Sequence, residues 1–408
     1  MSNTPRLRFP GFTGEWKEQP LSKFLFEHKT KSDGKCEVHS VSVSKGVINQ
    51  VEYLGRSFAA ADTSKYNLAK PNDIIYTKSP TGDFPYGIVK QNKNPYNVIV
   101  SPLYAVYSPI NKHVGYILDS YFESSVNTNN YLSSLVQKGA KNTINITNDT
   151  FVSKNVCLPS DPAEQEKIAS CLTEIDNLIA AQDQKVDALK EKKKALMQQM
   201  FPQPGETTPK LRFPKFEGEW EEMLLSDCLE ERNEQYPESK KYPLMAFVAE
   251  KGVSPKGEKY DRSALVKDAA NKKYKRTELG DFIYSSNNLE SGSIGFNTYG
   301  CACISPVYSI FKSKNNVDPI FIGSLLTQKS FIAEMVKYRQ GVVYGQWKIP
   351  EKEFLGIKVY IPHPEEQQKI AECLSALDDT IKSESDKLDA LKDHKKGLMQ
   401  QLFPQPSK

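Results

Sequence analysis

Residues 161–204 read DPAEQEKIASCLTEIDNLIAAQDQKVDALKEKKKALMQQMFPQP, and residues 363–406 read HPEEQQKIAECLSALDDTIKSESDKLDALKDHKKGLMQQLFPQP. The two stretches are identical at 25 of 44 positions, which identifies them as copies of one element. A second pair of copies precedes them, because PRLRFPGFTGEW at 5–16 recurs as PKLRFPKFEGEW at 209–220, with nine of twelve positions identical. The chain therefore consists of two repeats of a common plan.

Both long copies have the pattern of a helix. In the first copy Asp161 is a suitable N-cap, Pro162 suits the first helical position and Glu164 would complete a capping box. Apolar residues recur in alternating steps of four and three, which is the heptad seam of a coiled coil. The seam residues are Ile168, Leu172, Ile175, Ile179, Val186, Leu189 and Leu196 in the first copy, and Ile370, Leu374, Leu377, Ile381, Leu388, Leu391 and Leu398 in the second.

Two matching seams in one chain most simply pair with each other, and the length of the connection predicts their direction. A helix over residues 162–200 is roughly 58 Å long, whereas the connector 201–208 extends at most about 28 Å. The chain cannot easily return to the start of the first helix, so we expect an antiparallel pair. The alternative, in which each helix covers only its own domain, stays open because amphipathic helices often do so.

The stretches before the two helices match only faintly, in fragments such as NDIIYTKSP (72–80) against GDFIYSSNN (280–288) and SPLYAVY (101–107) against SPVYSIF (305–311). Both contain short strand-like runs and some helical stretches, punctuated by Gly, Pro and Asn. The predicted fold is α+β: mixed α/β domains at 1–160 and 205–362, separated by an antiparallel two-helix coiled coil from 161–204 and 363–408, with a pseudo-two-fold internal repeat. Like helices with unlike domains suggest a common scaffold for two different recognition surfaces.

Composition excludes several classes of protein. The chain has 408 residues, of which 38% are hydrophobic, and no apolar run approaches the ~20 residues that cross a bilayer. The N-terminus has no apolar core of a signal peptide, and the seven cysteines are scattered without a disulfide framework or a zinc-like spacing. We therefore expect a cytoplasmic protein with reduced thiols, no metal site and no membrane partner.

Signatures of catalysis are absent. The sequence contains no GxxxxGK[ST] loop, no G-x-G-x-x-G after a strand, no H-E-x-x-H and no G-x-S-x-G. No pair among the 50 acidic residues stands out as a general acid and base. The sequence therefore favours binding over catalysis, and we expect no cofactor on this chain.

Charge and local composition favour DNA as the ligand of the domains. Residues 1–160 carry a net charge of +6 and residues 205–362 a net charge of +2, whereas each helix segment carries −2. Just before each helix lies a loop that combines Gly with Lys, Arg, Asn and Gln, the side chains that contact phosphates and base edges. The predicted DNA contacts are Lys78, Lys138, Lys141, Asn142 and Asn145 in the first domain, and Lys273, Lys275, Arg276, Asn287, Arg339, Gln340, Tyr344, Gln346 and Lys348 in the second.

The whole arrangement resembles the specificity subunit of a Type I DNA restriction-modification system. The resemblance rests on the alternation of variable domains with near-identical helices, on the P-x-E-Q-x-x-I-A helix starts at 162–169 and 364–371, and on the LRFP-x-F-x-G-E-W domain starts. It implies two target-recognition domains, each reading one half of a bipartite asymmetric site in double-stranded DNA. It also implies helices that set the spacer and dock two methyltransferase subunits, through which restriction subunits join the complex.

The resemblance further implies a non-catalytic chain, with S-adenosylmethionine, ATP and Mg²⁺ on the partner subunits of an adenine methyltransferase and ATP-dependent endonuclease. A helix of roughly 58 Å would span about 17 base pairs, which suits two short half-sites with a fixed gap. The alternative function is a coiled-coil adaptor with two protein-binding end domains. An adaptor would show no salt-sensitive DNA binding.

Overall fold

The computed structural model describes residues 4–138, 144–249, 251–255, 273–289, 292–342 and 346–404. Its internal contacts divide the chain into two units. Unit 1 comprises Met1–Asp183 with Asp386–Lys408, and unit 2 comprises Gln184–Ser385. Each unit therefore holds one of the two domains together with half of each repeat helix.

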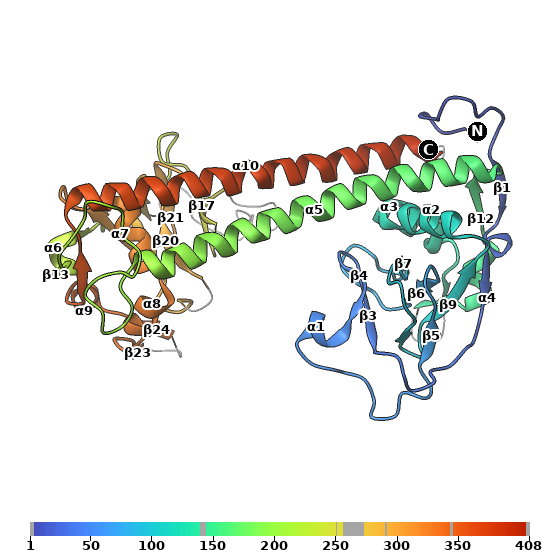
Figure 1. Cartoon of the computed structure of the whole chain (residues 1–408), viewed down its shortest axis with the longest axis horizontal. Helices are drawn as coiled ribbons and strands as arrows, with labels where there is room; N and C mark the ends of the chain where they lie inside the picture. The colour runs from blue at the N-terminus through green and yellow to red at the C-terminus, as the bar shows by residue number, and fades with distance from the viewer. Residues whose placement is uncertain are drawn as a thin grey trace. The chain divides into compact units, whose positions relative to one another are not determined.

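The repeat helices are α5 (Pro162–Met200) and α10 (Pro364–Leu402), drawn green and red in Figure 1. In unit 1, Ile168 and Leu172 near the start of α5 share a buried cluster with Leu402 at the end of α10. In unit 2, Met200 at the end of α5 shares a cluster with Ile370 near the start of α10. Each helix start thus lies beside the other helix's end, which confirms the predicted antiparallel pair.

The same clusters contain the interiors of the domains, so the helix starts also cover their own domains. The two arrangements considered from the sequence therefore coexist. Every predicted seam position in α5 and α10 is buried or half-buried. Among the described residues, no helix combines the length and apolarity that a membrane span requires.

The domain of unit 1 is built around one antiparallel sheet of order β2-β9-β6-β7, and its first and last strands, β1 and β12, pair with each other. In the core that packs against this sheet, the ring of Phe151 stacks on that of Tyr76 with 4.3 Å between the ring centroids. The elements are β1 (Lys17–Pro20), the 3-10 turn η1 (Leu21–Lys23), β2 (Leu25–Glu27), β3 (His39–Ser42), β4 (Gly46–Asn49), α1 (Gln50–Leu54), β5 (Asn67–Ala69), β6 (Ile74–Tyr76), β7 (Val89–Gln91), β8 (Val98–Val100), β9 (Ala105–Pro109), α2 (Lys112–Glu123), α3 (Ser125–Ser133), β10 (Gln137–Lys138), β11 (Ile144–Asn145), α4 (Asn148–Ser153) and β12 (Asn155–Leu158).

The domain of unit 2 repeats this topology, with a sheet of order β14-β22-β19-β20 and a terminal pair β13 and β25. In the equivalent core the ring centroids of Phe354 and Phe311 lie 4.6 Å apart. The elements are β13 (Glu221–Leu224), α6 (Leu225–Cys228), β14 (Leu229–Glu231), β15 (Gln235–Tyr236), β16 (Ala246–Val248), β17 (Gly252–Ser254), β18 (Tyr274–Thr277), β19 (Phe282–Tyr284), β20 (Ile294–Phe296), β21 (Ala302–Ile304), β22 (Ser309–Ser313), α7 (Pro319–Leu326), α8 (Lys329–Val336), β23 (Gln340–Val342), β24 (Gln346–Lys348), α9 (Glu351–Leu355) and β25 (Lys358–Ile361).

The repeated LRFP segments attach to the helix starts through buried ion pairs. Arg8 donates from Nε and Nη2 to the two carboxylate oxygens of Glu164, at 2.7 and 2.9 Å. Arg212 binds Glu366 in the same way, at 2.9 and 2.7 Å. Such bidentate pairs fix direction as well as distance. The segment before each domain is therefore held in the same way in both units.

This pairing corrects one prediction about the start of α5. Asp161 does cap the helix, because its Oδ1 accepts from the N–H of Ala163 at 2.8 Å. Glu164 does not complete a capping box, since both of its carboxylate oxygens bind Arg8. A partner 156 positions away wins over the local backbone because the guanidinium supplies two charge-assisted hydrogen bonds.

Candidate nucleic-acid interface

The predicted loop before α9 is a two-stranded hairpin. β23 and β24 pair antiparallel, with Gln340 opposite Lys348 and Gly341 opposite Trp347. Because side chains alternate along a strand, Gln346 and Lys348 lie on one face of the hairpin together with Gln340, and all three are exposed. A two-stranded ribbon of this kind fits the major groove of B-DNA.

The hairpin is attached to the segment that follows β19. Asn287 accepts a hydrogen bond from the N–H of Trp347 through its Oδ1, at 2.6 Å. Ser286 likewise accepts from the N–H of Ile349 through its Oγ, at 3.0 Å. Asn287, predicted from sequence as a DNA contact, thus lies beside the hairpin that carries Gln346 and Lys348.

Unit 1 has the equivalent hairpin from β10 and β11, where Gln137 pairs with Asn145 and Lys138 with Ile144. The predicted contacts Lys141 and Asn142 lie outside the described residues, as does Tyr344 in the second domain, and the side chains of Lys138 and Asn145 are not described either. Lys78 is exposed and follows β6, which is the counterpart of β19. The same parts of the fold thus carry predicted contacts in both domains.

The basic run at 273–276 is placed differently from what the sequence suggested. Lys275 is only 7% exposed within β18. The guanidinium of Arg276 lies 3.6 Å from the ring centroid of Tyr236 and 4.5 Å from that of Tyr242, and 3.9 Å from a carboxylate oxygen of Glu234. We therefore withdraw Lys275 as a phosphate contact, because this residue is almost entirely buried in the sheet, and among the described members of this run Lys273 is exposed.

Sequence reasoning also missed a residue. Trp347 is exposed at the centre of β24, between two predicted contacts. The alternation Gln-Trp-Lys after a stretch of sequence with two glycines was the available signal, because aromatic residues are enriched at binding surfaces. Arg339, by contrast, is half-buried just before β23, where its N–H donates to the carbonyl of Val336.

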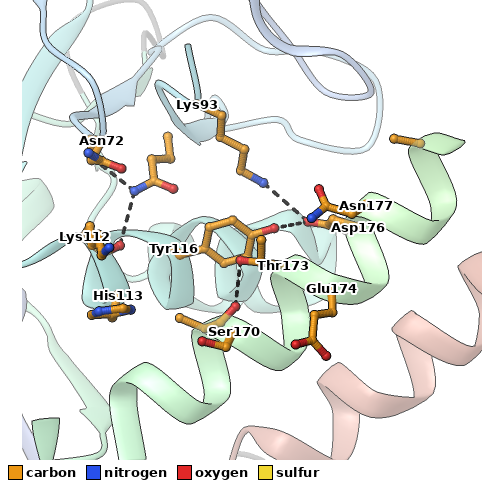
Figure 2. Close-up of a pocket in the computed structure, with 13 residues that line it drawn as sticks. Asn72, Lys93, Lys112, His113, Tyr116, Ser170, Thr173, Glu174, Asp176 and Asn177 are labelled. Atoms are coloured by element: carbon orange, nitrogen blue, oxygen red, sulfur yellow. Dashed lines mark hydrogen bonds and ion pairs between the residues drawn. The ribbon is translucent and has the colours of Figure 1, made fainter. Parts of the chain in front are cut away.

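In unit 1 a cavity of about 720 Å³ lies where the domain meets the helix α5. Figure 2 shows its wall, in which Lys93 and Tyr116 from the domain converge on Asp176 of α5. The Nζ of Lys93 lies 2.8 Å from Asp119 and 3.5 Å from Asp176, and 4.3 Å from the ring centroid of Tyr116. These contacts fasten the domain to its helix.

Asp176 also forms an ion pair with a lysine of α10. The Nζ of Lys395 lies 2.7 Å from Asp176 and 2.5 Å from Glu123 of α2. Burial raises the pKa of Asp176, but hydrogen bonds from Lys395 and Tyr116 outweigh it and hold this pKa below its usual value. The repeat-related pair in unit 2 joins Lys193 to Asp378 at 2.6 Å, so both units carry an ion pair between the helices.

A family profile described as "Type I restriction modification DNA specificity domain" matches residues 25–191 and again residues 217–393. The chain belongs to this family. Both matched segments of this specificity-domain protein begin inside one of the unlike domains and end inside a repeat helix.

Two curated relatives come from Methanocaldococcus jannaschii. The chain is 26% identical over 286 residues to the Type I restriction enzyme MjaVIII specificity subunit, which covers 62% of this chain and 63% of the relative. It is 25% identical over 266 residues to the putative Type I restriction enzyme MjaX specificity subunit, covering 61% and 59%. The specificity-domain chain thus spans about 60% of the length of these relatives.

A solved structure shares the fold across the whole chain. The Type I restriction-modification system S subunit from M. genitalium covers 99% of this chain and 100% of its own, with a TM-score of 0.59 at 14% sequence identity. At this identity the likeness concerns the fold alone. Two mixed α/β domains with a pair of long helices are therefore an architecture that this specificity-domain protein shares with that S subunit.

Proposed function

We propose that this chain is the DNA-binding specificity subunit of a Type I restriction-modification complex. Each domain reads one half of a bipartite, asymmetric site in double-stranded DNA. The observation that carries the proposal is the family match to both repeats, together with two domains whose main sheets share one strand order and which each contain a hairpin of unlike sequence. A shared topology supplies the same docking geometry, and unlike side chains supply different base preferences.

The DNA contacts that we propose in the second domain are the exposed face of the β23–β24 hairpin, Asn287 beside it and Lys273. Glutamine pairs through two hydrogen bonds with adenine, and lysine contacts guanine or phosphate. In the first domain we propose Lys78 and the β10–β11 hairpin. Lys138, Lys141, Asn142, Asn145, Arg276, Arg339 and Tyr344 remain candidates from the sequence.

We propose that α5 and α10 set the gap between the half-sites and dock two methyltransferase subunits, with restriction subunits joining through them. Methylation, ATP use and cleavage would then belong to those partners, which would bind S-adenosylmethionine, ATP and Mg²⁺. The domain boundaries 1–160, 161–204, 205–362 and 363–408, and a cytoplasmic location, belong to the same proposal.

The test is a genome-wide comparison of modified bases in the source cells with and without this gene. The proposal expects one methylated bipartite motif to disappear on deletion and to return on complementation. An unchanged methylome, with the partner genes expressed, would contradict it. The adaptor alternative is separated by binding of the assembled complex to duplex DNA, which an adaptor would not show at any salt concentration.

Single substitutions then locate the reading surface. Gln346→Ala should relax the preference at one position of the half-site read by the second domain, at a cost of about 1–3 kcal/mol. Lys348→Ala should weaken binding to all sequences alike if that side chain contacts phosphate. Lys312→Ala is a matched control, because Lys312 is an exposed strand lysine that pairs with Glu230 on another part of the same domain.

A further inference from the structure

Both domains display the same tight turn between equivalent strands. Ser101-Pro102-Leu103-Tyr104 connects β8 to β9, and Ser305-Pro306-Val307-Tyr308 connects β21 to β22. The N–H of Tyr104 donates to the carbonyl of Ser101 at 3.1 Å, and that of Tyr308 to the carbonyl of Ser305 at 3.3 Å. At the tips of these turns Leu103 is 76% exposed and Val307 is 69% exposed.

The turn itself does not explain the exposed aliphatic side chain. Ser at the first position and Pro at the second are favoured in such a turn, and the third position, which does not have positive φ in either turn, accepts most residues and does not require an aliphatic one. Tyr104 and Tyr308 pack against small apolar clusters, and this packing explains why both turns have a tyrosine at the fourth position. Leu103 and Val307 contribute little to packing, yet both unlike domains carry a branched aliphatic residue there.

The turn lies at the end of the sheet that carries the proposed interface. Tyr76 pairs with Ala105, and Tyr284 pairs with Ser309. The segments that lead to Lys78 and Asn287 therefore leave the sheet at the end where the turns enter it. In unit 2 this is also the end to which the β23–β24 hairpin is attached through Asn287.

An exposed lysine flanks the turn in each domain. Asn67 pairs with Val100, and Lys275 pairs with Ile304. Lys65 therefore precedes β5 at the end of that strand that faces the β8–β9 turn, and Lys273 precedes β18 at the end that faces the β21–β22 turn. Both lysines are exposed, so each turn combines an apolar tip with a neighbouring positive charge.

We infer that the two turns are equivalent wedges that enter the minor groove of each half-site and contact DNA without reading its sequence. This inference rests on the proposed function. The apolar tip of Pro and Leu or Val would press against a base step and open it, as Leu and Pro side chains do in DNA-bending proteins. Lys65 and Lys273 would bind the flanking phosphates. The turn is common to both unlike domains. It would thus contact the parts of DNA that are common to all half-sites, which are the backbone and the stacked bases.

The test uses the complex assembled with its methyltransferase subunits on a duplex that carries its methylated motif. The double variant Leu103→Ser, Val307→Ser should lose roughly tenfold in affinity and reduce the DNA bend measured by end-to-end FRET, with the preferred bases unchanged. Lys65→Gln and Lys273→Gln should each lower the slope of log affinity against log salt by about 1. The matched control is Leu279→Ser, because Leu279 is 70% exposed but precedes β19 at the other end of the sheet.

The outcomes separate this inference from the proposed function. Equal affinity and bend for the double variant and for the Leu279→Ser control would overturn the wedge and leave the specificity role intact. A double variant that fails to bind the methyltransferase subunits in the absence of DNA would also overturn it, because the turn would then be a protein contact. A wild-type complex that binds no specific duplex would refute the proposed function, and the wedge with it.

Discussion

The ion pairs between the helices allow one prediction in which the chain supplies its own control. Lys395 and Lys193 occupy the same position of the two repeats, and each pairs with the repeat-equivalent aspartate of the other helix. Their surroundings differ, because the Lys395 side chain is 9% exposed between Asp176 and Glu123, whereas that of Lys193 is 24% exposed. Replacing each lysine by methionine removes the charge and keeps most of the apolar stem.

The structure predicts unequal costs for the two substitutions. Removing one partner of a buried ion pair costs about 3–5 kcal/mol. Asp176 would still accept a hydrogen bond from Tyr116 and lie 3.5 Å from Lys93, so we expect Lys395→Met to cost about 2–3 kcal/mol of unit 1 stability. Lys193→Met removes a more exposed pair and should cost about 0.5–1 kcal/mol of unit 2 stability.

Tryptophan fluorescence during urea unfolding measures both values in the intact chain. The chain has three tryptophans, of which Trp16 is buried in unit 1, and Trp220 and Trp347 belong to unit 2. Replacing Trp347 by Phe and then also replacing Trp220 leaves Trp16 as the reporter of unit 1. Replacing Trp347 by Phe and then Trp16 leaves Trp220 as the reporter of unit 2. Equal destabilisation by the two lysine substitutions would refute the argument from burial.

The pH dependence of the same variants checks the electrostatic cause. Because the pKa of Asp176 is held below its usual value, this carboxylate contributes stability above about pH 4 and loses it as the pH falls through the folded-state pKa. Burial lowers the pKa of Lys395, but Glu123 and Asp176 outweigh it and raise the pKa, so its contribution is lost only at strongly alkaline pH. We expect the stability difference between wild type and Lys395→Met to shrink below pH 4.

Three further predictions concern the repeat, a loop and the spacer. A chain that ends after Pro204 keeps both Asp176 and Lys193, so we expect it to form a symmetric dimer through its helix, and a strictly monomeric species in sedimentation would contradict the pairing. Gly87→Ala should destabilise unit 1 by about 2 kcal/mol or more in urea unfolding, because φ is +97° and a Cβ would lie 1.9 Å from a carbonyl oxygen, whereas Gly82→Ala, with open space around its Cβ, should cost about 1 kcal/mol. Inserting one heptad into both helices should lengthen the gap in the methylated motif without changing either half-site, and altered half-sites would refute the spacer role.

The sequence by itself determined the repeat, the two long helices and their antiparallel pairing. These follow from information that is local or periodic: an apolar seam with heptad spacing, a capping residue at Asp161 and a connector too short to reverse the chain. Comparing the two copies position by position along the chain also showed that the helices are alike and the domains unlike. The family resemblance rested on this arrangement as well.

Only the tertiary structure decided which polar residues face solvent at the domain ends. Lys275 is buried and Arg276 lies against two tyrosines, because the strand that carries them sits between two others. Asn287 meets Trp347 across 60 positions of sequence, and Glu164 binds Arg8 across 156. Such contacts depend on strand order and on charge pairing between distant segments, which a local pattern does not encode. A basic or amide-rich run therefore predicts a binding surface only after the fold has placed its side chains outside.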